Sequence, residues 1–178
     1  MKYSKSQRKR ILNTAISIIE KDGIDKLTIR ELVKKTNVGT QSVYKHFPNK
    51  DELIKTIASK LTTDYLDEVN KSALLNPKEK LIHSASFFLK KTSEHPHLMD
   101  FLFFNPKIEN ILPKNTVNIP THFIGRINSA LNVTQVKEDR QELFLRIWAI
   151  IHGLAMMIKN GLLEYTPALA QNRLASMI

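Results

Sequence analysis

The sequence contains no cysteine, little glycine and only short apolar runs. The absence of cysteine excludes disulfides, thiolate nucleophiles and thiolate metal sites, and it is compatible with a reducing compartment. The histidines show no metal-ligand spacing, so we expect neither a metal nor another cofactor. Five glycines and seven prolines lie among 178 residues, with no internal repeat or low-complexity tract. With 42% hydrophobic residues, the chain has enough for one compact core or for a small domain joined to a larger one.

The apolar runs are too broken to predict a signal peptide or a membrane span. The first run, residues 11–19, is interrupted by three polar residues, and charged residues follow where a signal peptide has its cleavage site. The longest later run, residues 147–158, contains His152 and Gly153 and is short for a bilayer. We therefore expect a soluble, cytoplasmic protein without a membrane partner.

Positive charge is concentrated in the first third of the chain. The net charge is +10, and residues 1–55 hold 13 Lys and Arg against 6 Asp and Glu, whereas residues 56–178 hold 14 against 11. Such an excess suits a polyanionic partner. Charged faces usually serve only solubility, but this excess coincides with the motif that follows, which favours a functional interpretation.

Two short helices joined by a tight turn are predicted within the basic part. Thr28 and Glu31 have the spacing of a capping box, in which the hydroxyl accepts from the Glu31 amide and the carboxylate accepts from the Thr28 amide. Leu27 and Leu32 have the spacing of the accompanying hydrophobic staple. The capping box predicts the first of the two helices, with its start at this threonine.

The turn is predicted at Asn37-Val38-Gly39, where Asn and Gly tolerate positive φ and Val38 fills the angle between the helices. A second helix over residues 40–47 would bury Val43 and Phe47 and expose a row of polar side chains. Pro48 ends this helix, and Asn49 caps the next one together with Glu52. A short helix with a polar outer face fits the major groove of DNA, so the sequence predicts a DNA-binding unit.

The segment from about Lys5 to Leu53 resembles the DNA-binding domain of the TetR family of bacterial transcription regulators. The resemblance rests on an apolar helix, the two-helix unit and its Tyr44-Lys45-His46-Phe47-Pro48-Asn49-Lys50 ending. The family commonly has Ser at the position of Gly39 and Gly at the position of Gln41. Gly39 is still compatible with a helix N-cap. Gln41 has a side chain long enough to reach a base, so the operator cannot be inferred from relatives.

Roles on double-stranded DNA follow from position and from the resemblance. The start of the second helix supplies the candidates for base contacts: Thr40, Gln41, Ser42 and Lys45. In the family, the positions of Tyr44, His46 and Lys50 mostly contact the phosphate backbone. Thr28 and Arg30 are expected to add contacts to the backbone from the preceding helix. His46 is equally compatible with packing beside Tyr44. The basic residues from Lys5 to Arg10 are compatible with a phosphate-binding arm or with a frayed, solvated terminus.

Beyond residue 50 the apolar pattern is helical throughout, and we expect an all-α fold of about nine helices. Domain 1–50 would bind DNA, and domain 51–178 would bind a ligand and dimerise, with a linking helix over residues 49–70. Residues 105–120 are expected to form a loop. Further helices are predicted after Pro77, over residues 98–104, 121–131 and 137–160, and after Pro167.

Trp148 and His152-Gly153 resemble the Trp-x-x-x-His-Gly signature of one class of TetR-type C-terminal domains. The resemblance implies a homodimer through the last two helices and a cavity for a small apolar or amphipathic effector. The candidates for lining such a cavity are Phe88, Phe101, Phe104, Phe123, Trp148, His152 and Met156. Aromatic residues at helical spacing more often form ordinary core.

Three classes of function remain open from the sequence. The first is a dimeric repressor that a small effector releases from a near-palindromic operator. The second is a DNA-binding protein that is controlled by a partner protein or acts architecturally. The third, a helical-bundle enzyme, is disfavoured because no nucleophile with a base and no carboxylate or histidine pair emerges, so we expect no catalysis.

Overall fold

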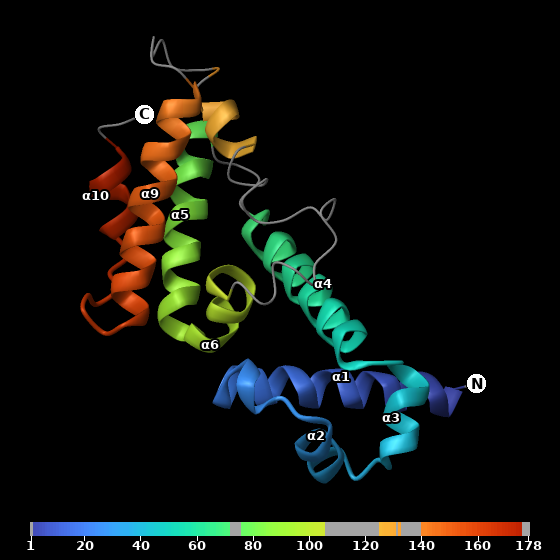
Figure 1. Ribbon diagram of the computed structural model, residues 1–178. Helices are drawn as coiled ribbons and strands as arrows, with labels where there is room; N and C mark the ends of the chain where they lie inside the picture. The colour runs from blue at the N-terminus through green and yellow to red at the C-terminus, as the bar shows by residue number, and fades with distance from the viewer. Residues whose placement is uncertain (1, 72–75, 106–124, 131, 133–139, 176–178) are drawn as a thin grey trace. The chain divides into compact units, whose positions relative to one another are not determined.

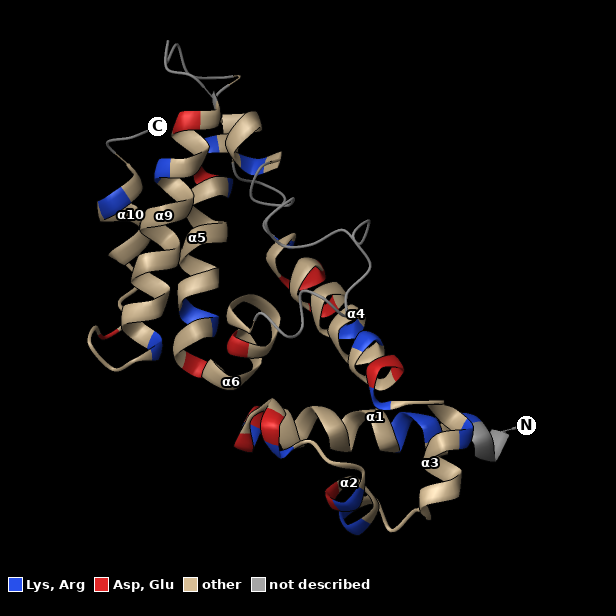
Figure 2. Cartoon of the chain, in the orientation of Figure 1, with Lys and Arg blue, Asp and Glu red and all other residues tan. Residues whose placement is uncertain are grey.

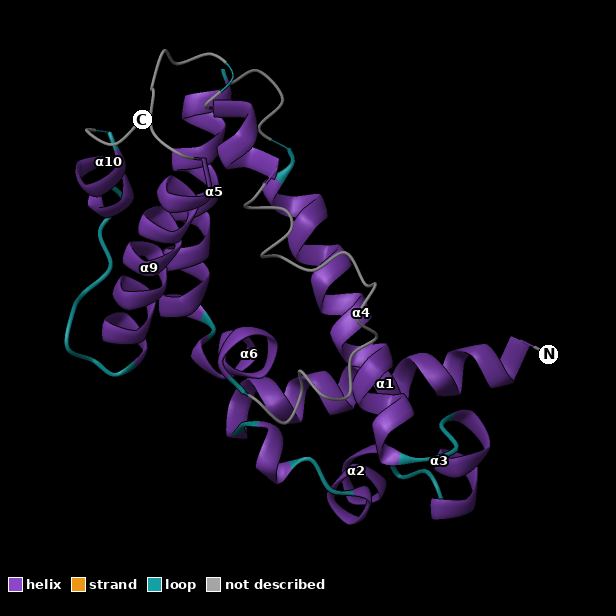
Figure 3. Ribbon diagram, turned by 45° about the horizontal axis from the view of Figure 1, so that its top comes forward, coloured by secondary structure: helices purple, strands orange, loops and turns teal. Residues whose placement is uncertain are grey.

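The chain is built from α-helices (Figure 1). The computed structural model describes residues 2–71, 76–105, 125–130, 132 and 140–175. These residues form helices, turns and connecting segments and contain no strand, which confirms the predicted all-α class (Figure 3). In chain order the helices are α1 (Lys2–Asp22), η1 (Ile24–Lys26), α2 (Ile29–Thr36), α3 (Thr40–His46), α4 (Lys50–Val69), α5 (Pro77–Glu94), α6 (Pro96–Met99), the π-helical turn η2 (Asp100–Phe104), α9 (Arg140–Lys159) and α10 (Leu169–Leu174). Residues 125–130 are also helical.

The described residues form two compact units that are discontinuous in the sequence. The first contains the residues up to Thr63 and those from His95 to Asn105. The second contains the residues from Asp64 to Glu94 and those after residue 124. Helix α4 therefore contributes residues to both units. The division predicted from the sequence separates residues 1–50 from residues 51–178. The contacts within the chain also place residues 51–63 and 95–105 in the first unit.

The core of the first unit forms around α1. Ile11, Ala15, Ile18 and Ile19 recur at three- and four-residue spacing, and each is at most 1% exposed. They pack in one cluster with residues of α2, α3 and the first half of α4. Burial of this apolar stripe holds the short helices α2 and α3, because helices of seven or eight residues are not stable alone.

Segment 95–104 also belongs to the first unit. Pro96 occupies the first turn of α6, and the ring Nδ1 of His95 lies 2.9 Å from Oε1 of Glu20 at the end of α1. Phe101, in the π-helical turn, is fully buried in the same core as α1, with Leu98 and Leu102 packed against that core. A side chain from the middle of the chain thus completes the N-terminal core.

The second unit consists mainly of α5, α9 and α10, which pack against one another (Figures 1 and 3). A reciprocal capping box opens α5: the Glu79 amide donates to Asn76 Oδ1 at 2.9 Å, and the Asn76 amide donates to Glu79 Oε2 at 3.1 Å. The interior is formed by Leu81, Ala85, Phe88 and Leu89 of α5, Leu143, Ile147, Ile151 and Ala155 of α9, and Ala170 and Leu174 of α10.

Most of the predicted helices are observed. The helix predicted over residues 49–70 is α4, and the helix predicted over residues 137–160 is α9 within the described residues. The stretch predicted as one helix over residues 98–104 is divided between α6 and the π-helical turn. The predicted loop at residues 105–120, apart from Asn105, and the predicted cavity residue Phe123 lie outside the described residues.

Helix α9 is more apolar than the run of residues 147–158 suggested. The stretch Gln141–Lys159 has a mean hydropathy of 1.3, so by length and composition alone it is sufficient to cross a bilayer. The expectation that this part of the chain is too short was wrong on that criterion. However, core helices of soluble proteins have the same composition, and one face of α9 is buried against α5 and α10. We therefore interpret α9 as a core helix with a second apolar face.

Candidate nucleic-acid interface

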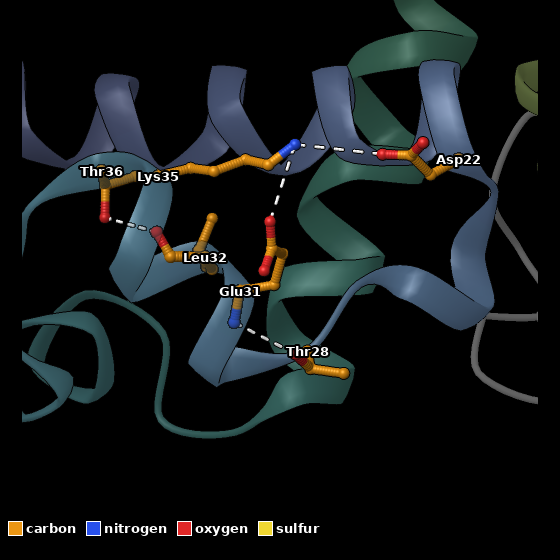
Figure 4. A network of polar contacts seen from close by, with 6 residues as sticks. All are labelled: Asp22, Thr28, Glu31, Leu32, Lys35 and Thr36. Atoms are coloured by element: carbon orange, nitrogen blue, oxygen red, sulfur yellow. Dashed lines mark hydrogen bonds and ion pairs between the residues drawn. The ribbon is translucent and has the colours of Figure 1, made fainter.

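Helix α2 begins at the predicted cap. Thr28 has extended backbone angles, and its Oγ1 accepts a hydrogen bond from the Glu31 amide at 3.1 Å (Figure 4). Leu27 and Leu32 are both buried in the core of the first unit, as the staple predicted. The cap satisfies one of the free amides at the helix start, and the two leucines set the angle at which the chain enters the helix.

The second half of the predicted capping box is not formed. The Glu31 carboxylate turns toward Lys35, with Oε1 3.7 Å from Nζ, rather than back to the Thr28 amide (Figure 4). The same Nζ lies 3.9 Å from Oδ2 of Asp22 on α1. A lysine four residues further along the helix competes for the carboxylate. Because these pairs are long and exposed, they contribute little to stability.

The turn between α2 and α3 uses one left-handed residue. Asn37 has φ 51° and ends α2, and Val38 is 3% exposed and fills the angle between the helices, as predicted. Gly39 has φ −60° and serves as the N-cap of α3 without a side-chain hydrogen bond. Its tolerance of positive φ is therefore not used, and α3 starts without the cap that a serine would supply.

Helix α3 buries one side and exposes the other. Val43 is fully buried and Phe47 is 2% exposed, so both anchor the helix in the core. Thr40, Gln41 and Lys45 are exposed, Ser42 is partly exposed, and Tyr44 is 45% exposed although it is aromatic. These are the side chains for which base or phosphate contacts were predicted. The structure places them on a short helix whose opposite side is buried in the core.

Helix α1 holds the end of α3 through two contacts that the sequence did not reveal. The His46 ring Nε2 lies 3.1 Å from Oε1 of Gln7. The guanidinium of Arg8 lies 4.8 Å from the centre of the Phe47 ring. His46 is thus partly buried and hydrogen-bonded to α1, a partner that differs from the predicted packing beside Tyr44. Neither partner follows from spacing, because the contacts join positions 39 residues apart in sequence.

The first turn of α4 lies directly after α3. The Glu52 amide donates to Asn49 Oδ1 at 2.8 Å, as the second predicted cap required. Lys50 is exposed in this first turn, and Thr28 and Arg30 are exposed at the start of α2. Lys and Arg residues also recur along the N-terminal half of α1 and in α2 (Figure 2). This unit therefore has the positive charge that binding to a phosphate backbone requires.

The predicted ligand-binding residues are divided between the units. In the second unit the Trp148 ring centre lies 6.1 Å from that of Phe88 and 5.6 Å from that of His152, and Met156 is partly buried on the same helix. Phe101 and Phe104 belong to the first unit. Burial lowers the pKa of His152, which favours its neutral form. The described residues contain no group of three or more His, Cys, Asp or Glu side chains that could hold a metal.

Residues 11–57 match the family model described as bacterial regulatory proteins, tetR family. The chain carries a TetR-family DNA-binding domain. The match covers the core residues of α1, the turn at Asn37 and α3, which are the features that position the exposed polar face. The TetR-family resemblance predicted from the sequence is thereby confirmed.

Comparisons with individual proteins agree with this assignment. An uncharacterised HTH-type transcriptional regulator, YvdT of Bacillus subtilis (strain 168), is 35% identical over 68 residues, which is 38% of this chain and 35% of that protein. The match thus spans about a third of that relative.

Two solved structures resemble this chain over nearly its whole length. RolR, in a complex with resorcinol, covers 99% of this chain and 87% of its own, with a TM-score of 0.65 and 17% identity. The transcriptional regulator FadR from Bacillus subtilis, in a complex with stearoyl-CoA, covers 95% of this chain and 96% of its own, with a TM-score of 0.73 and 15% identity. At such low identity these likenesses show that the fold is shared.

Proposed function

We propose that the chain is a sequence-specific DNA-binding transcriptional regulator. In this proposal it acts as a dimeric repressor that a small-molecule effector releases from a near-palindromic operator. The observation that carries the proposal is the exposed polar face of α3 on a TetR-family domain. The members of the family and the relatives found are regulators, which argues against an enzyme.

The exposed side chains of α3 and of Lys50, at the start of α4, suit two kinds of contact. Gln41 has the amide that pairs with adenine in the major groove, and Lys45 has the donor that suits guanine. Tyr44 and Lys50 suit phosphate oxygens, which position the protein and carry no sequence information. All four side chains are exposed, which both kinds of contact require.

A second copy of the chain is the proposed partner of α9. Leu145, Ala149, Gly153 and Met157 follow one another at four-residue spacing, and all four are exposed. Leu145 is 52% and Met157 42% exposed, which is unusual for large apolar side chains on a long helix. Pairing of α9 and α10 with their copies would cover this stripe. Two α3 helices about 34–36 Å apart would then contact successive major grooves.

The proposed effector is a small apolar or amphipathic molecule bound in the second unit. Trp148 and His152, which are partly exposed beside the buried Phe88, provide aromatic rings that also carry polar nitrogens there. Resorcinol and stearoyl-CoA, the ligands named for the two similar structures, are amphipathic as well. Effector binding would change the spacing of the two DNA-binding units and so lower the affinity for the operator.

Selection of binding sites from a random duplex library at near-physiological salt tests the proposal. Enrichment of one inverted repeat, with half-sites about one helical turn apart, is the expected result. Recovery of unrelated sequences would refute sequence-specific reading. The basic unit would then be a non-specific clamp, and control by a partner protein or an architectural role would replace the repressor.

A further inference from the structure

The ring of His46, in the last turn of α3, has a partner on α1. Its Nε2 lies 3.1 Å from Oε1 of Gln7. An amide oxygen only accepts hydrogen bonds, so Nε2 is the donor in this contact. A neutral imidazole carries one N–H group, and here Nε2 has it. Gln7 therefore selects the neutral form of His46 in which Nδ1 has no hydrogen.

The other ring nitrogen of His46 is open to solvent. Within the part of the chain that the structure describes, His46 makes no second hydrogen bond and no ion pair. The ring is only partly buried, and Nδ1 is not one of the buried polar atoms that lack a partner. In the neutral form Nδ1 only accepts, as phosphate oxygens do. Neutral His46 therefore offers a phosphate no hydrogen bond at Nδ1, whereas the protonated ring donates from both nitrogens.

The charged side chains on the elements around His46 are mainly cations. They are Arg8 and Arg10 of α1, Arg30, Glu31, Lys34 and Lys35 of α2, Lys45 of α3, and Lys50, Asp51 and Glu52 of α4. The Arg8 guanidinium lies 4.8 Å from the ring centre of Phe47, the residue after His46. The carboxylates of Glu31 and Glu52 pair with lysines of their own helices. No carboxylate of the described residues contacts His46, so the counter-charge for a protonated ring has to come from a partner.

We propose that Gln7 is a positioning residue for DNA binding and makes this binding depend on proton uptake by His46. Gln7 holds the Nε2–H group, and a proton from solvent binds to Nδ1, which then donates to a phosphate oxygen of the DNA backbone. The hydrogen bond between an imidazolium and a phosphate is charge-assisted and stronger than a neutral one. The proposal rests on the proposed function, because it needs DNA at α3.

The expected consequence is an affinity for DNA that rises on acidification. Histidine is the side chain that ordinarily changes charge between about pH 5 and pH 8. Tyrosine and lysine have reference pKa values of about 10, so phosphate contacts by these residue types do not change in that range. A pH dependence therefore separates a histidine contact from the other contacts predicted for the same surface.

The first test measures the affinity of the full-length protein for a duplex with the selected site, at constant ionic strength. For the wild type we expect at least about tenfold tighter binding at about pH 6 than at about pH 8, because a hydrogen bond to a charged group forms. His46→Gln keeps an amide donor and should lose this rise. The matched control, His97→Gln, replaces an exposed histidine of α6 in the same unit and should keep it.

Substitution of Gln7 tests its role as a positioning residue. Gln7→Ala releases Nε2, so the neutral ring is free to carry its hydrogen on Nδ1 and to donate to phosphate without an added proton. We therefore expect an affinity at least equal to that of the wild type at about pH 8, and a rise of less than about twofold on acidification. Gln7→Glu keeps the acceptor and adds a carboxylate that stabilises the protonated ring, so the rise should move to higher pH.

Spectra of the wild-type ring report on the hydrogen directly and need no variant. Long-range proton–nitrogen correlations of the free, neutral His46 should show a hydrogen on Nε2 and none on Nδ1. Addition of the duplex at the same pH should produce the pattern of an imidazolium, in which both nitrogens carry a hydrogen.

The proposal is overturned if the wild type and His46→Gln have the same pH dependence, or if free, neutral His46 carries its hydrogen on Nδ1. A Gln7→Ala variant that loses the same affinity at every pH would show that Gln7 only supports the fold, and would overturn it as well. A selected site that is bound equally well throughout the pH range would refute proton uptake and leave the proposed regulator intact. If no site is selected, the proposed function and the proton-linked contact are both refuted.

Discussion

A single hydroxyl group starts helix α2. Thr28 accepts from the Glu31 amide at 3.1 Å, and no reciprocal bond from Glu31 supports it. We predict that Thr28→Ala lowers the free energy of unfolding by about 1 kcal/mol, because an N-terminal amide loses its partner. Urea unfolding followed by circular dichroism measures this change.

The control for this prediction is Thr63→Ala. The Thr63 hydroxyl donates to the Ser59 carbonyl within α4, at 3.0 Å, and the side chain is exposed. The Ser59 carbonyl also accepts a backbone hydrogen bond within the helix. Loss of the Thr63 hydroxyl should therefore change the free energy of unfolding by less than about 0.5 kcal/mol. Equal effects of the two substitutions would show that the Thr28 cap does not stabilise the domain.

Gln41 and Tyr44 lie three residues apart on the exposed side of α3 and are expected to act differently. Gln41→Ala should change which operator sequence is preferred and leave non-specific affinity nearly unaltered, because a base contact is lost. Tyr44→Ala should weaken binding to all sequences, because a phosphate contact is lost. Site selection and titration with non-specific duplex measure the two effects. Selection of the wild-type site by Gln41→Ala would contradict the base-reading role.

Residues that interact with near neighbours in the chain were predictable. The cap at Thr28, the left-handed Asn37 and the buried Val38 follow from local rules, which depend on a few adjacent positions. The contacts of Gln7 with His46 and of Arg8 with Phe47 were not predictable. They depend on how two helices cross, and a single sequence carries no pattern that pairs residues so far apart.

At the level of elements, α9 has two apolar faces, and one is exposed. We predict that Met157→Glu weakens dimerisation by at least about tenfold, because the substitution would bury an unpaired carboxylate in the interface. Analytical ultracentrifugation over a range of concentrations measures the effect. Ser93→Glu, which adds the same group on the exposed side of α5, should leave the dimer unchanged. A dimer that persists with Met157→Glu would place the interface elsewhere.

Helix α5 carries a histidine that favours the neutral form. Burial, and then the nearby Arg126, lower the pKa of His83 below its ordinary value of 6.5. The unfolded chain therefore binds more protons than the folded chain as the pH falls below about 6.5, so stability decreases with acidification. We predict a larger drop in melting temperature between about pH 7.5 and pH 5.5 for the wild type than for His83→Gln. Equal drops in the two proteins would contradict a role for His83.

The positions of the long helices were predictable because apolar residues recur every three or four positions along them. The division of residues 98–104 between α6 and a π-helical turn was not predictable. A π-helical turn arises when side chains must fit a core that other elements supply. Periodicity within a segment contains no information about that fit.

At the level of the whole molecule, the N-terminal core depends on Phe101. We predict that Phe101→Ala destabilises the first unit by about 3–5 kcal/mol, because it leaves a cavity in a fully packed core. Hydrogen exchange of the amides in α1, α2 and α3 measures the loss. Phe87→Ala, in the second unit, should leave these amides protected, and Phe101→Leu should retain the fold with a smaller loss. Unchanged exchange in Phe101→Ala would show that Phe101 is not required.

The same residue shows the limit of prediction for the whole chain. Phe101 and Phe104 were predicted to line an effector cavity together with Trp148, on the basis of their aromatic character. The burial of Phe101 was predictable from its aromatic character, but the choice between two cores was not. That choice depends on the return of segment 95–104 to the first unit, which is a property of the tertiary fold.

The place of Phe101 has a consequence for the order of events during synthesis. A ribosome adds about 5–20 residues per second, so seconds pass between the emergence of α3 and that of Phe101. During that interval α1, α2 and α3 lack a side chain that completes their core. A nascent fragment therefore has an incomplete core around α1, and we expect its DNA-binding unit to reach full stability only after translation has passed Phe101.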